Sequence, residues 1–165
     1  MSPSIGVKTE DHIVREDESD SASAMYYHYN FLGEIKTLHI SEGTGVTEFG
    51  MVLRDASGVF IGCRSSVFHG RLQVSEGETM SILEALSWVH NLGFQKVIFE
   101  SDLKIVVDAL GSSVNDLSEF ASIVSQCKII MHAYPEFIVR FVPRKANEIA
   151  HVVARNAHCC PNPSS

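Results

Sequence analysis

The sequence predicts one α/β domain, built on a mixed five-stranded sheet of three antiparallel strands plus parallel strands, with helices on both faces. Three observations lead to this class. Strand-like segments come first along the chain, helices and strands then alternate, and the composition is that of a chain with a sizeable core. The 165 residues are 45% hydrophobic, with a mean hydropathy of +0.08. This length fits one domain and requires no second one.

Three strands are expected in the first half of the domain. Hydrophobic and polar residues alternate over 35–41, which is the period of a strand with one buried face. Two further runs rich in β-forming residues cover 46–54 and 59–67, and the turn Asp55-Ala-Ser-Gly58 joins them as a hairpin. We expect these three strands to form an antiparallel meander.

The second half of the chain alternates between helices and strands. Apolar residues recur at helical spacing over 75–91, with Gly93 where a glycine after a helix belongs. The strand 96–100 (KVIFE) and the helix 103–110 follow, an order that implies a parallel crossover connection. The remaining expected elements are a helix over 120–132, a strand over 137–142 and a last helix over 148–157 that opens at Asn147.

The two ends of the chain differ in composition from its middle. Residues 1–24 are rich in Ser, Asp and Glu, and we expect them to form a disordered acidic tail because they can bury little apolar surface. Residues 25–33 are an aromatic lead-in segment, 34–160 the folded domain and 161–165 a C-terminal tail. No apolar run approaches the roughly 20 residues that span a bilayer, and no signal peptide is recognisable. The protein is therefore expected to be intracellular, in the nucleus or cytoplasm.

Charge and cysteine content narrow the classes of partner and compartment. The net charge of −7 argues against a strongly basic surface for nucleic acid. However, residues 1–33 hold six of the 20 acids and two of the 13 bases, so the rest of the chain has a net charge of only −3. Charge alone therefore neither excludes nor indicates nucleic acid. The four cysteines show no C-x-x-C spacing, and we expect reduced thiols.

Two carboxylates stand at positions suited to metal-assisted chemistry. Asp102 directly follows the strand KVIFE, and the carboxyl ends of strands are where α/β sheets place ligands. Glu78 lies near the start of the first helix on the same face as Ile82, the face expected to contact the sheet. Each acid has a purely structural alternative. Glu78 would complete the capping box Ser75-x-x-Glu78, and Asp102 would be the N-cap of the next helix.

Three segments carry motifs in a fixed order along the chain. They are VLRDASGVFIG (52–62), ETMSILEALSWVHNLGFQKVIFESD (78–102) and FVPRKANEIAHVVARNA (141–157). The first matches a V-x-R-D-x-x-G hairpin and the last a V-P-R-x-x-N-x-x-A-[DH]-x-x-A segment. Together they resemble the plant reverse-transcriptase-like branch of the ribonuclease H superfamily. The resemblance spans roughly residues 34–158 and implies the ribonuclease H-like fold.

The resemblance implies a Mg²⁺-dependent endonuclease that cleaves the RNA strand of an RNA/DNA hybrid, with four acids around two metal ions. Glu78 and Asp102 match the second and third acids, as catalytic and metal-binding residues. The first acid falls on Ser41, or after a one-residue slip on Glu42, which would supply a catalytic, metal-binding carboxylate. The fourth position holds His151, which would bind a softer ion such as Mn²⁺, carry a proton, or simply lie on the surface.

Basic residues precede the last expected helix, on the side where the resemblance implies contact with the hybrid. They are Arg144 and Lys145, followed by Asn147 as a polar neighbour. Positive groups there would bind phosphates, although a solvated loop explains them equally well. Three hypotheses stay open: a Mg²⁺- or Mn²⁺-dependent hydrolase with weakly bound metal, a degenerate domain that binds nucleic acid without cutting it, and a protein-interaction module.

Overall fold

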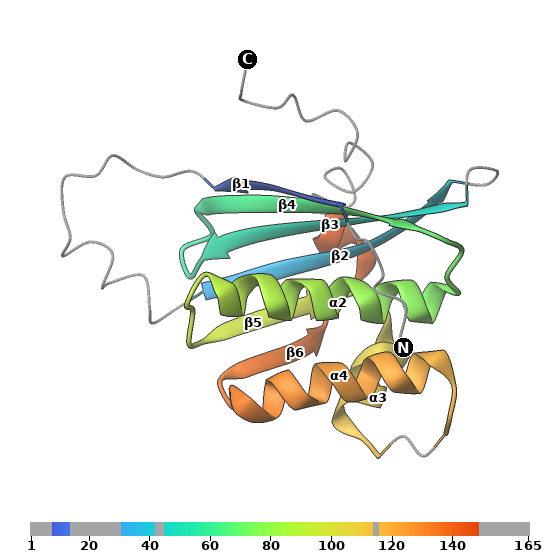
Figure 1. Cartoon of the computed structure of the whole chain (residues 1–165). Coiled ribbons are helices and arrows are strands. Elements are labelled where there is room, and N and C mark those ends of the chain that lie inside the picture. The colour runs from blue at the N-terminus through green and yellow to red at the C-terminus, as the bar shows by residue number, and fades with distance from the viewer. Residues whose placement is uncertain (1–7, 14–30, 42–44, 114–115, 149–165) are drawn as a thin grey trace.

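The structure is a computed structural model that describes residues 8–13, 31–41, 45–113 and 116–148. Its strands are β1 (Lys8–Ile13), β2 (Phe31–Ser41), β3 (Val46–Asp55), β4 (Phe60–His69), β5 (Val97–Ser101) and β6 (Phe137–Phe141). They form a six-stranded sheet in the order β1-β4-β3-β2-β5-β6 (Figure 1). Neighbours from β1 to β2 are antiparallel, whereas the β2–β5 and β5–β6 pairs are parallel. The predicted meander and parallel crossover are thus confirmed.

The sheet differs from the expected five strands at its N-terminal edge. β1 lies inside the segment predicted to be a disordered tail, and pairs antiparallel with β4 from Lys8↔Val67 to Ile13↔Gly62. The sequence KTEDHI gave no signal because most of its residues are polar. An edge strand can be held by backbone hydrogen bonds to its neighbour, which leave no hydrophobic pattern in the sequence. The rest of that segment lies outside the described residues.

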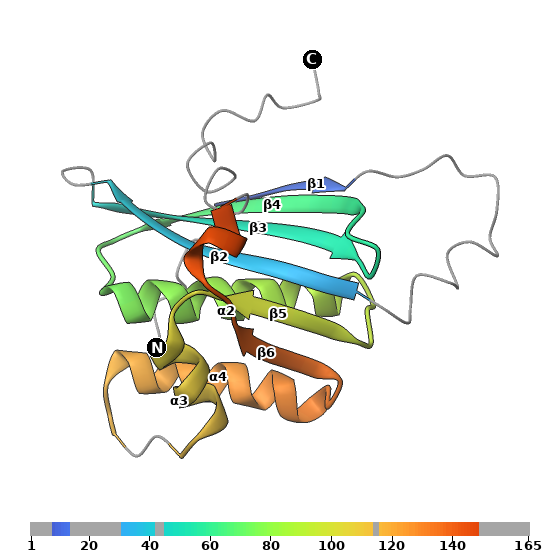
Figure 2. The same ribbon diagram turned by 180° about the vertical axis from the view of Figure 1, so that it is seen from behind.

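Three α-helices and one 3₁₀ turn accompany the sheet. They are α2 (Val74–Asn91), α3 (Lys104–Gly111), α4 (Glu119–Ala133) and η1 (Arg144–Asn147). The two views show α2 on one face of the sheet and η1 on the other (Figures 1 and 2). The expected helix 148–157 lies beyond η1, and only its first residue is described. Whether a helix covers the second face is therefore not tested.

The core lies between the sheet and the helical face of α2. On β3, the side chains of Phe49, Met51 and Leu53 alternate into this layer, as a strand with one face on the core requires. From α2, Ile82 and Leu86 meet them at helical spacing, and both are almost completely buried. α2 ends where the sequence predicts, because Gly93 adopts a positive φ of 82° just after it.

The second long helix, α4, packs against α2 through a buried cysteine. The Cys127 Sγ lies 3.8 Å from the Thr79 carbonyl of α2 and donates to it. Cys127 is completely buried, and this burial raises the pKa of its thiol from 9.0 to about 12. Neither Cys63 nor Cys127 is in a disulfide bond, in agreement with the sequence prediction for these two residues.

We predict that Cys127 makes stability fall in alkaline solution. The thiol keeps its proton in the folded state up to a pKa of about 12, whereas the unfolded chain loses it near 9.0. This contribution is therefore fully present below pH 9 and is lost as the pH rises toward 12, by at most about 1.4 kcal/mol per pH unit. Cys127→Ala should cost about 1 kcal/mol at neutral pH but lack this loss. Urea unfolding below and above pH 9 measures the free energy of unfolding of the natural chain and of Cys127→Ala. If this free energy falls equally with pH above 9 in the two proteins, the prediction is wrong.

A second prediction concerns β1. In an antiparallel edge strand, successive N–H groups point alternately to the neighbouring strand and away from it. Proline removes an N–H, so only one of Glu10→Pro and Asp11→Pro should break a hydrogen bond to β4. We expect one variant to lower the melting temperature by a few degrees and the other to lower it clearly less. Equal melting temperatures in both variants and the natural chain would mean that the β1–β4 pairing adds no stability.

Candidate nucleic-acid interface

Glu78 lies in the second turn of α2 and is only 7% exposed. The sequence left open whether it merely caps the helix. In the structure the cap lies two residues earlier, where Gln73 is the N-cap and its N–H donates to the Glu76 carboxylate at 2.8 Å. The capping box thus uses Gln73 and Glu76 instead of Ser75 and Glu78. The structure assigns Glu78 no role in the cap, and it is a buried carboxylate beside the sheet.

Asp102 follows β5 directly and is partly buried. Its structural alternative was to cap α3, but the N-cap of that helix is Leu103, whose own side chain makes no capping hydrogen bond. The turn is held instead by Ser101, whose Oγ accepts from the Leu103 N–H at 3.3 Å and whose carbonyl accepts from the Val142 N–H at 2.9 Å. Asp102 is therefore held at the strand end by its neighbours, without serving as the cap itself.

The two acids belong to the same end of the domain. α2 runs opposite to β5, so the amino end of α2, with Glu78, and the carboxyl end of β5, with Asp102, point the same way in both views (Figures 1 and 2). The sequence prediction placed a third ligand, Ser41 or Glu42, beside them. Glu42 and His151 lie outside the described residues, so their placement stays a prediction.

The sheet register places Lys36, and not Ser41, level with Asp102. β2 and β5 pair in parallel up to Glu34↔Glu100, and β5 ends at Ser101. Counting on from this last pair sets the backbone position of Lys36 against Asp102. Ser41 instead pairs with Val46 at the far end of β2, roughly 15 Å farther along the strand. The expectation that Ser41 or Glu42 supplies the first metal position stays a prediction.

The donors among the described residues do not make up a two-metal site. Over 8–13, 31–41, 45–113 and 116–148, no three His, Cys, Asp or Glu residues come together as metal ligands. Mg²⁺ needs near-octahedral oxygen coordination, and Glu78 and Asp102 supply only two carboxylates. We therefore derive no catalytic step through a metal ion.

The predicted basic residues lie on the sheet face opposite α2. η1 crosses that face near β2, and Arg144 and Lys145 within it are exposed (Figure 2). Asn147 is the last residue of η1, and its side chain lies outside what the structure describes. The turn is anchored to the sheet by the bond from Val142 to Ser101, next to Asp102. The structure thus brings two cations to the sheet end that carries Asp102.

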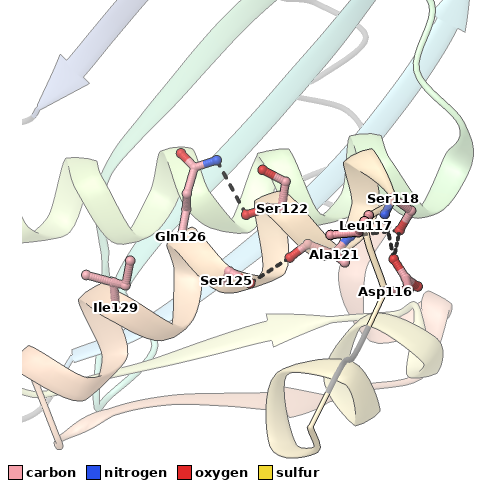
Figure 3. A pocket seen from close by; sticks show the side chains of 8 residues that line it. All are labelled: Asp116, Leu117, Ser118, Ala121, Ser122, Ser125, Gln126 and Ile129. Atoms are coloured by element: carbon pink, nitrogen blue, oxygen red, sulfur yellow. Dashed lines mark hydrogen bonds between the residues drawn. The ribbon is translucent and has the colours of Figure 1, made fainter.

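A shallow hollow along α4 is a different feature. It is lined by Asp116, Leu117, Ser118, Ala121, Ser122, Ser125, Gln126 and Ile129 (Figure 3). The N-cap Ser118 accepts from the Ala121 N–H at 3.1 Å, and its hydroxyl and N–H both donate to Asp116. Two hydrogen bonds lower the pKa of Asp116: the larger effect comes from the Ser118 hydroxyl and the smaller one from the Ser118 N–H. These contacts are those of a capped helix start, and we assign the hollow no ligand.

Comparison with known proteins identifies the family and the fold of this chain. The model of the reverse transcriptase-like family matches residues 36–157. RNase H1 from the archaeon Halobacterium salinarum superposes with a TM-score of 0.69 at 19% identity, covering 78% of this chain and 96% of that one. LC11-RNase H1, isolated from compost and solved in complex with an RNA/DNA hybrid, gives 0.66 at 16% identity, covering 76% and 94%. No curated protein shows significant sequence similarity. These structures show that the fold is RNase H-like.

Proposed function

Because the chain belongs to the reverse transcriptase-like family, with an RNase H-like fold, we propose that it binds nucleic acid, preferentially an RNA/DNA hybrid. The proposed surface is the sheet face that carries η1, with Arg144, Lys145 and Asn147 contacting the phosphate backbone. LC11-RNase H1 holds such a hybrid on the same fold, which supports this class of ligand. The four cysteines show no C-x-x-C spacing, which suits reduced thiols in a reducing compartment, and we propose the nucleus or cytoplasm.

One observation favours binding over efficient cleavage. Counted on from the Glu34↔Glu100 pair, the β2 backbone position set against Asp102 holds Lys36, and this supports binding without the ligand set of two Mg²⁺ ions. A lysine supplies no oxygen ligand, but its positive charge favours phosphate in the same region. We therefore propose that Mg²⁺ or Mn²⁺ binds weakly, if at all, through Glu78, Asp102 and Glu42, and that the natural chain cuts hybrid poorly.

Binding of the full chain to a short labelled hybrid tests this function, with duplex DNA and single-stranded RNA as competitors. We expect salt-dependent binding in EDTA, because phosphate contacts with lysine and arginine release counterions and need no metal. Lys145→Ala should weaken it and reduce the salt slope by about one. Lys96→Ala is the matched control, because Lys96 is an exposed lysine at the opposite end of β5, paired with Glu136 at 3.3 Å. Failure to bind any nucleic acid in low salt would overturn the proposal.

The register gives a sharp prediction about catalysis. Lys36→Asp should raise Mg²⁺-dependent cleavage of an RNA/DNA hybrid at least about tenfold, because it replaces a cation by an oxygen ligand level with Asp102. Ser41→Asp, roughly 15 Å farther along β2, should have no such effect. Adding Asp102→Asn to the first variant should abolish the gain. A gain from Ser41→Asp with none from Lys36→Asp would show that the register argument is wrong.

A further inference from the structure

An ion pair joins the last two parallel strands of the sheet. Glu100 of β5 and Arg140 of β6 are direct partners in the strand register. The Arg140 Nε donates to the Glu100 Oε1 at 2.8 Å, and the Arg140 Nη2 donates to the same oxygen. The two ends of the pair differ in environment: the Glu100 side chain is 6% exposed and that of Arg140 is 50% exposed. A buried carboxylate therefore holds a guanidinium that reaches the surface.

The geometry of this pair leaves part of the guanidinium available. Both bonds come from one side of the group and end on one carboxylate oxygen. Across 8–13, 31–41, 45–113 and 116–148, no residue accepts a hydrogen bond from the Arg140 Nη1. A guanidinium carries five N–H donors, and an edge with Nη1 and the second Nη2 proton matches two oxygens of a phosphate. Because Glu100 already fixes the orientation, less side-chain freedom would be lost on binding.

Arg140 lies on the face that carries the other exposed bases. Along β6, Phe137 and Val139 pack on the core, so Arg140 stands on the opposite face, away from α2. The chain then passes through Val142, which is bonded to Ser101, into η1 on that same face (Figure 2). Arg140, Arg144 and Lys145 therefore form a row of exposed cations along one short segment. Because the net charge of the whole chain is negative, this local group of positive charges is not apparent from the composition.

We infer that Arg140 is a phosphate-binding residue of the nucleic-acid surface and that Glu100 is its positioning residue. This inference rests on the proposed function, and names a side chain that the motif comparison did not select. The ligand chemistry is a backbone phosphate, recognised by shape and charge without reading bases. Arg140 would extend the proposed surface from η1 to the edge strand of the sheet, so that bound nucleic acid reaches across β6.

The test compares binding of the labelled hybrid in EDTA, over a range of salt, by the full-length chain and its variants. Arg140→Gln should weaken binding about tenfold and reduce the salt slope by about one, since one charged contact is lost. Arg140→Lys should keep the slope but weaken binding severalfold, because a lysine lacks the planar fork. Glu100→Gln should weaken binding severalfold with an unchanged slope, which a purely structural role would not predict.

Stability and background controls keep the test decisive. Arg140→Gln leaves a buried carboxylate without its partner, so melting temperature is measured for each variant. The double variant Glu100→Gln/Arg140→Gln carries no buried charge and should bind as Arg140→Gln does, because Glu100 acts only through Arg140. Lys96→Ala should match the natural chain. Suppose that the natural chain binds the hybrid and Lys145→Ala weakens this binding, but Arg140→Gln and the double variant bind normally. This result would overturn the inference about Arg140 and leave the proposed function standing. If the natural chain binds no nucleic acid, the proposed function is overturned together with the inference.

Discussion

The parallel pairing of β2 with β5 is the constraint on which the rest of the structure depends. β2 is the strand that joins the antiparallel half of the sheet, through β3, to the parallel half, through β5. A shift of this register by one residue would change every pair of facing positions and turn each side chain of the shifted strand to the other face of the sheet. The register therefore decides which positions of β2 lie beside the end of β5. The position of α2 follows from it as well, because α2 packs its buried face across the same strands.

The same register bears on the proposal that this chain binds metal weakly. Glu78 lies buried on α2 and Asp102 follows the end of β5. On the neighbouring strand, counting on from the Glu34↔Glu100 pair reaches Lys36. A divalent ion held by two carboxylates beside a positive charge would be bound weakly, because charge repulsion opposes what the oxygen ligands contribute. A phosphate group would meet the opposite situation there, in keeping with the proposed binding of nucleic acid.

Local charge matters more here than net charge. The chain is acidic overall, yet the segment from Arg140 to Lys145 places three exposed cations on one face of the sheet. One of them is oriented by Glu100, whose burial requires a partner of opposite charge. The ion pair thus compensates the charge of a buried acid. As a consequence, an arginine at the surface is held in a defined orientation.

The sequence by itself determined the order of the described helices and strands from β2 onward and most of their positions, although β2 begins at Phe31, four residues before the predicted strand. Hydrophobic periodicity sufficed there, because the face that each element buries leaves its period in the chain, as Phe49, Met51 and Leu53 show on β3. It also selected Glu78 and Asp102. Only the tertiary structure decided that β1 extends the sheet, in which register β2 pairs with β5, and that Glu100 holds Arg140. These features depend on backbone pairing between segments far apart in sequence, and such pairing leaves no local periodicity from which it could be read.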